Sequence, residues 1–180
     1  MGRRPQKGLC LIGLAVALTV VFPMVASAEI TAVRLGFEEL CSHCAAALQQ
    51  TLSRVEGVDT VQVSVEPAQA TLTLKAGQPL EVETLRTALA AKQFTPTWIR
   101  FEAVGLLTLH EGTTGLRVQG TTQVIPLESS AKLAELLQAV RRDCELVFIV
   151  GFIPPGQVTA RIERYEVRGL LGHPWRGEPC

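Results

Sequence analysis

Two cysteines, Cys41 and Cys44, lie three residues apart in the stretch EELCSHCAAALQQ, residues 38–50. This spacing lets both sulfurs face one point, and soft-metal binding, thiol–disulfide exchange and a structural disulfide all use it. The residues after Cys44 have helical spacing, so we expect both cysteines at the start of a helix. Unpaired N–H groups and the positive end of the helix dipole favour the thiolate there, which is the form that binds metal.

The N-terminal segment indicates the compartment in which these thiols lie. Residues 1–7 carry three positive charges and no acid, and an uncharged apolar run with a 14-residue core, residues 9–22, follows. This run suits a signal peptide and is short for a membrane span. Ala26-Ser27-Ala28 matches the small-x-small cleavage pattern, so we expect a signal peptide, residues 1–28, cleaved after Ala28. The alternative is an uncleaved membrane anchor, because the run is uncharged throughout.

Cleavage would leave a periplasmic or secreted chain, residues 29–180, which is long enough for one domain or two small ones. Its net charge is −3, because the signal removes three positive charges from a chain whose charges otherwise balance. Nothing electrostatic therefore indicates nucleic acid as a partner. The four remaining cysteines, Cys41, Cys44, Cys144 and Cys180, are too few for a disulfide scaffold. The sequence leaves open whether Cys144 and Cys180 pair.

The first half of this chain alternates strand and helix patterns. Apolar residues alternate, as in half-buried strands, at 30–37, 61–65 and 70–74, and they follow helical spacing at 42–55 and 82–89. A last strand is predicted at 95–101. The order βαββαβ within about 70 residues predicts a ferredoxin-like domain, residues 29–103, with a four-stranded antiparallel sheet under two helices. The cysteine loop would then lie at one end of the sheet.

Three stretches resemble the heavy-metal-associated domain family: CSHC at 41–44, LSRVEGVDTVQVSV at 52–65 and LRTALAAKQFTPTWI at 85–99. Copper chaperones, metal-pumping ATPases and the periplasmic mercury-binding protein contain this domain. The resemblance implies that Cys41 and Cys44 bind one soft metal ion, Cu(I), Hg(II) or Zn(II). It also implies transfer of the ion to or from a partner protein, a transporter or a chaperone, by ligand exchange. Phe94 falls in the loop where the family carries an aromatic residue or a lysine beside the metal.

The sequence departs from the family just before the first cysteine. The family usually has Gly-Met-Thr there, whereas this chain has Glu38, Glu39 and Leu40. Phe37 or Leu40 is expected to replace the missing methionine beneath the loop. Two carboxylates beside a thiolate pair favour a divalent ion over a monovalent one, and a carboxylate could serve as a third, harder ligand. The accessory residue His43 is expected to project to solvent.

The alternative function is a periplasmic thiol–disulfide redox protein that uses the same CxxC pair. An exported CxxC at a helix start fits that chemistry as well. A thioredoxin-like fold would, however, carry an aromatic residue beside the motif and a later cis-proline, and its order of elements is not βαββαβ. The sequence shows no Gly-rich phosphate loop and no nucleophile with a base beside it, so we expect a binding protein and not an enzyme.

The second half, residues 104–169, has a different pattern, and a tail of residues 170–180 follows it. Strands are predicted at 105–109, 116–119, 122–127, 145–153 and 158–167, with a helix after Ser130. The expected fold class is thus α+β, a ferredoxin-like domain followed by a small β-rich, OB-like domain. This half lacks a stripe of aromatic and basic residues, so we expect packing or partner docking. Cys144 is expected to be an inert core thiol, and His110 and His173 are expected at the surface.

Overall fold

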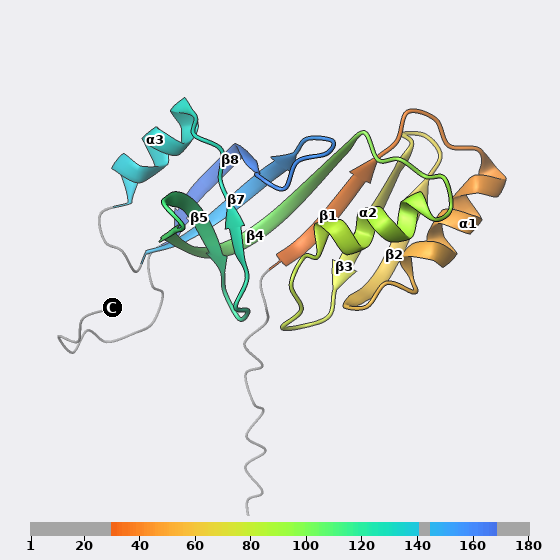
Figure 1. Cartoon of the computed structure of the whole chain (residues 1–180), viewed down its shortest axis with the longest axis horizontal. Helices are drawn as coiled ribbons and strands as arrows, with labels where there is room; N and C mark the ends of the chain where they lie inside the picture. Colours follow the sequence, from red (N-terminus) through yellow and green to blue (C-terminus); the bar gives the residue numbers. More distant parts are fainter. Residues whose placement is uncertain (1–29, 141–144, 169–180) are drawn as a thin grey trace, which may run out of the picture.

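The structure is a computed structural model that describes residues 30–140 and 145–168. The predicted signal peptide and its cleavage site, the tail, Cys144, Cys180 and His173 lie outside the described residues. The elements are β1 (Ile30–Gly36), α1 (Ser42–Leu52), β2 (Val58–Ser64), β3 (Gln69–Leu74), α2 (Val82–Ala90), β4 (Trp98–His110), β5 (Thr113–Val118), β6 (Val124–Pro126), α3 (Ala131–Ala139), β7 (Leu146–Ile153) and β8 (Arg161–Arg168) (Figure 1). Among the described residues, no helix is long and apolar enough to cross a membrane.

The first four strands and two helices have the predicted βαββαβ order. The strands pair antiparallel in the order β2-β3-β1-β4, and α1 and α2 lie on one side of this sheet (Figure 1). Val33 and Leu35 of β1 and Leu48 and Leu52 of α1 are fully buried in one apolar core. The two-residue period of the strand and the four-residue spacing of the helix bring these side chains onto facing surfaces. The predicted ferredoxin-like arrangement is therefore confirmed.

Strand β4 is longer than the sequence pattern indicated. The predicted strands at 95–101 and 105–109 are a single strand, Trp98–His110, which continues across the boundary expected between residues 103 and 104. Its first part pairs with β1 and its last part with β5, while β7 pairs with its other edge from Ile99 to Leu106. Gly105 permits this close pairing, because a Cβ there would collide with the backbone of Arg117. The two halves of the chain thus share one strand.

The remaining strands continue the sheet and curl it. β5 pairs with β6, β7 pairs with β8, and Leu127 after β6 forms a parallel bridge with Ala160 before β8. At this bridge the Glu128 N–H donates to Ala160 O and the Ala160 N–H donates to Pro126 O, each at 2.8 Å. β4, β5, β6, β8 and β7 therefore follow one another around a closed circuit. β7 is buried on both faces from Val147 to Gly151, in agreement with its continuous apolar sequence.

Polar contacts also attach the region of α2 to the second half. The side chain of Gln123 accepts a hydrogen bond from the Leu80 N–H at 2.8 Å and donates one to the Leu80 carbonyl at 2.7 Å. Arg86 of α2 donates to the Pro154 carbonyl at 2.9 Å. On the other side of the core, Gly151 of β7 lies against the ring of Phe101 with no room for a Cβ. One sheet and one apolar core thus hold both halves together.

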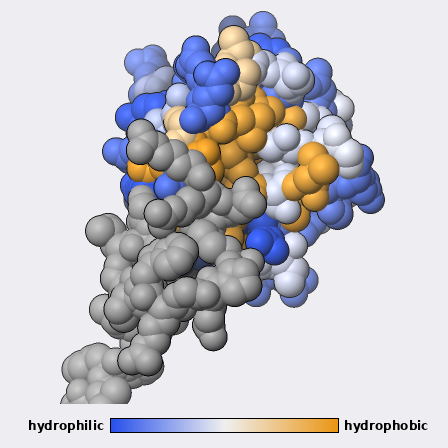
Figure 2. Space-filling view, turned by 90° about the vertical axis from the view of Figure 1, so that its left-hand side faces the viewer, coloured by the Kyte–Doolittle hydropathy of each residue, from blue (hydrophilic) through white to orange (hydrophobic). Residues whose placement is uncertain are grey.

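Apolar side chains are exposed on the side of the molecule that carries α3. Leu137 is 48% exposed and Leu109 is 75% exposed, and both line a hollow between α3 and the β4–β5 hairpin. Figure 2 views this side and shows apolar surface gathered on it. Leu133, Leu136 and Leu137 have the sequence spacing of one helix face. Leu133 and Leu136 are buried and Leu137 is exposed, so α3 buries only part of this face.

Candidate metal centre

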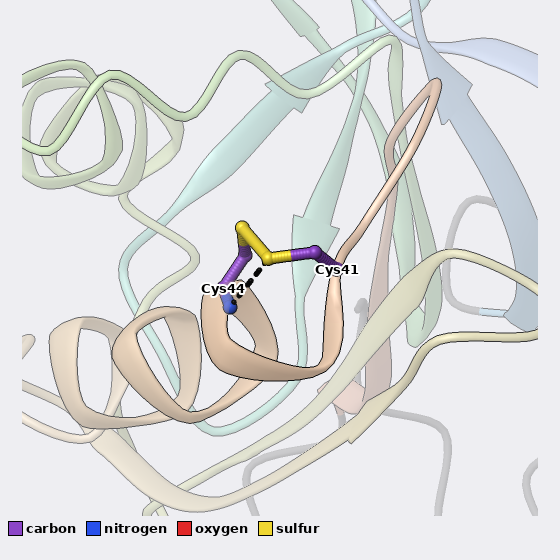
Figure 3. Close-up of a disulfide and its surroundings, with 2 residues drawn as sticks. All are labelled: Cys41 and Cys44. Atoms are coloured by element: carbon purple, nitrogen blue, oxygen red, sulfur yellow. Dashed lines mark hydrogen bonds between the residues drawn. A yellow bond between two sulfur atoms is a disulfide. The ribbon is translucent and has the colours of Figure 1, made fainter.

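Cys41 and Cys44 lie at the start of α1, at one end of the first half's sheet, as the sequence predicted (Figure 3). Cys41 is the N-cap residue of α1, with an extended backbone, φ −80° and ψ 156°. Its Sγ accepts a hydrogen bond from the Cys44 N–H at 3.0 Å. The two Cα atoms are 4.9 Å apart, and the sulfurs form a disulfide. Reduction would therefore leave two sulfurs close enough to bind one ion.

The two cysteines differ in their surroundings. Cys41 is exposed, whereas Cys44 is half-buried and packs against the apolar core. Leu40, only 8% exposed, belongs to that core, and Phe37 packs against it. These are the two residues expected to replace the family's methionine. An incoming molecule therefore reaches Cys41 more easily than Cys44.

The loop that carries Cys41 is fixed where it leaves β1. The Gly36 carbonyl accepts hydrogen bonds from the Thr97 N–H at 2.8 Å and from Thr97 Oγ1 at 3.1 Å. The indole of Trp98 lies over Gly36, where a Cβ would collide with the ring. One residue later, the Phe37 N–H donates to the Ala68 carbonyl at 3.0 Å. These contacts to the neighbouring turns hold the start of the loop against the end of the sheet.

An open hollow of about 470 Å³ lies beside this loop and brings together residues from two loops. It is lined by Phe37, Glu38, Glu39, Gln93, Phe94 and Thr95. The rings of Phe37 and Phe94 pack edge to face with their centroids 6.4 Å apart. The second loop turns at Gln93, which has a positive φ of 62°, and the Phe94 N–H donates to the Leu89 carbonyl at 3.0 Å. Phe94 thus lies beside the acidic pair, while its expected place beside the metal stays a prediction.

The sequence did not single out Gln93 and Thr95, which also line the hollow. Their only signal is their position next to Phe94. His43, Glu38 and Glu39 are exposed. Throughout 30–140 and 145–168, no three His, Cys, Asp or Glu side chains converge as a group that could hold a metal ion. The structure therefore does not bring a carboxylate or His43 onto the cysteine pair as a third ligand, and the pair presents two sulfurs.

Comparison with known proteins supports the predicted heavy-metal-associated domain. Residues 40–95 match the family model described as Heavy-metal-associated domain. The crystal structure of oxidized MerP from Ralstonia metallidurans CH34 is similar at 30% sequence identity, covering 37% of this chain and 92% of that chain, with a TM-score of 0.33. No curated protein matches the chain. The matched residues include both cysteines and Phe94, and this part of the chain belongs to the heavy-metal-associated domain family.

Proposed function

We propose that this protein binds one soft metal ion, Cu(I) or Hg(II), through the reduced Cys41–Cys44 pair and exchanges it with a partner protein. The observation that carries the proposal is the position of the two sulfurs at the start of α1 in a heavy-metal-associated domain. The disulfide must first take up two electrons and two protons from a dithiol reductant. The resulting thiols then lose their protons as their sulfurs bind the ion.

The two-sulfur arrangement supports a soft ion of low coordination number. Thiolates prefer Cu(I) and Hg(II), whereas zinc in structural sites usually takes four ligands. Zn(II) would therefore need further ligands from solvent or from the partner. The different exposure of the two cysteines supports ligand exchange. A thiolate of the partner adds to the ion on the side of Cys41, and the Cys41 sulfur then leaves while Cys44 keeps its place against the core.

The proposal includes export and excludes catalysis as the main role. Export is supported by the charged, apolar and small-residue pattern of residues 1–28. A membrane contact would then arise only if this segment stayed uncleaved. A role in binding is supported by the cysteine pair at the start of α1 and by the match to the heavy-metal-associated domain.

We also propose that the second half is an OB-like barrel. The circuit β4-β5-β6-β8-β7, its parallel bridge between Leu127 and Ala160, and the position of α3 between β6 and β7 support this fold. The contacts of Gln123 and Arg86 with the other half support a fixed orientation. In this proposal the barrel is a rigid surface for packing or partner docking.

The alternative function is a thiol–disulfide redox protein, and the disulfide between an exposed Cys41 and Cys44 favours it. Such a protein would pass its disulfide to a substrate dithiol, so that Cys41 and Cys44 are reduced while the substrate is oxidised. Catalysed oxidation of a reduced dithiol test protein, lost in the serine variants, would favour this alternative over metal exchange.

Native mass spectrometry of the reduced chain, residues 29–180, tests the proposed function. With Cu(I) or Hg(II) we expect one ion per chain, and weaker binding of Zn(II). The double variant C41S/C44S should bind no ion tightly, while C144S serves as a control that keeps the pair. Unchanged binding in the double variant would contradict the assignment.

A further inference from the structure

We propose that Glu38 and Glu39 select the metal carrier, so that the cysteine pair exchanges its ion preferentially with thiolate carriers that bear positive charge. This inference rests on the proposed function and specifies the partner of the same site. It concerns the rate of exchange, whereas the proposed function concerns whether the ion binds at all.

The two carboxylates are available to an incoming molecule. Both are exposed, and both line the hollow beside the cysteine loop. Neither has an ion-pair partner among the described residues, whose ion pairs involve other glutamates. Their charge is therefore not neutralised within the described part of the chain, and it lies two and three residues before Cys41.

Among the described residues, no lysine or arginine lines this hollow. The nearest in sequence, Lys92, lines a different hollow, between α1 and α2, together with Arg54. At the position where the family carries an aromatic residue or a lysine, this chain has Phe94. The thiolates, their metal ion and the two carboxylates thus form a group with net negative charge for Cu(I) and for Hg(II). A positively charged carrier would therefore balance this group.

The exchange step makes the charge imbalance larger. When a carrier thiolate adds to the ion, three sulfurs share it until the leaving thiolate departs, and this intermediate carries one more negative charge than the loaded site. An ammonium group on the carrier, like that of a lysine, lowers the energy of this intermediate by pairing with the carboxylates of Glu38 and Glu39. The hollow is open and has room for such a group, and Phe37 and Phe94, which line it, are aromatic residues of the kind that attract cations.

The test uses Hg(II) complexes of two small thiols as carriers, cationic cysteamine and anionic 3-mercaptopropionate. Uptake by the reduced chain is followed by stopped-flow absorption at low salt. The measured quantity is the uptake rate from the cysteamine complex divided by the uptake rate from the 3-mercaptopropionate complex. We expect this ratio to be roughly tenfold larger in wild type than in E38Q/E39Q, because electrostatic steering changes association rates by this order. At about 1 M salt, where the screening length is roughly 3 Å, the advantage should disappear.

The matched control is E56Q/E135Q, which removes two exposed glutamates that do not line the hollow. It should keep the wild-type rate ratio, and all variants should reach the same stoichiometry. An equal ratio in wild type and E38Q/E39Q would overturn the inference while leaving the proposed function intact. Absence of uptake from either carrier at equilibrium would overturn the proposed function and the inference together.

Discussion

The backbone N–H of Cys44 donates a hydrogen bond of 3.0 Å to Sγ of Cys41. One sulfur atom is therefore the N-cap acceptor of helix α1 and also a proposed metal ligand. A side-chain acceptor at this position satisfies an N–H group that has no partner within the helix. Reduction and metal binding at this sulfur therefore affect the stability of the first turn of the helix. The stability of α1 and the proposed chemistry can be separated by substitution at this position.

Replacing Cys41 by Ser should abolish tight metal binding and leave the stability of the reduced protein nearly unchanged, because Ser is a good N-cap residue. C41A should also lose metal binding and should cost about 1 kcal/mol of unfolding free energy through loss of the cap. Urea unfolding of the reduced proteins measures the difference. S130A is the matched control, since Ser130 Oγ accepts from the Leu133 N–H at 3.2 Å at the start of α3. Equal stability of C41A and C41S would show that position 41 does not cap α1.

Restoring the family pattern with E38G/E39M should lower the affinity for Zn(II) more than the affinity for Cu(I). At a separation of about 6 Å, each exposed carboxylate would contribute, after screening, on the order of 1 kcal/mol per unit of metal charge. A divalent ion would gain this twice. Competition titrations with chelators measure both affinities, and E56Q/E135Q controls for net charge. If Cu(I) affinity falls as much as Zn(II) affinity, the carboxylates have no part in metal choice.

The variant Q123A should destabilise the whole chain by about 1–3 kcal/mol, because it leaves the N–H and carbonyl of Leu80 without their side-chain partner. Metal affinity should stay unchanged, since Gln123 does not line the hollow beside the cysteine loop. Urea unfolding followed by circular dichroism should show a single transition, because both halves share β4 and one core. Q138A, at an exposed position of α3, is the control. Two separate transitions would mean that the halves fold independently.

The exported protein should begin at Glu29, because the small residues Ala26 and Ala28 suit signal peptidase. A28K should block cleavage and keep the longer chain at the membrane, since a large charged residue does not fit the small-residue pattern. N-terminal sequencing of the periplasmic or secreted fraction and of the membrane fraction measures both results. Finding wild-type chains that still begin at Met1 in the membrane fraction would show an anchor.

Local patterns were sufficient to predict the order βαββαβ and the place of the cysteines. The alternation of Val33 with Leu35 and the spacing of Leu48 with Leu52 record which side of each element is buried. The position of Cys41 follows from the same kind of information, because a helix start is decided within one turn of the chain. The family motif adds the chemistry of that position.

Only the tertiary structure decided how distant segments meet. Strand β4 continues past residue 103 because β1, β5 and β7 pair with its two edges, and strand pairing over such separations leaves no local pattern. For the same reason the sequence did not predict that Gln93 joins Glu38 and Glu39 around one hollow. Periodicity shows which face of an element is buried, but packing between elements determines which partner covers that face. This packing brought the acidic pair, the aromatic rings and the cysteine loop together.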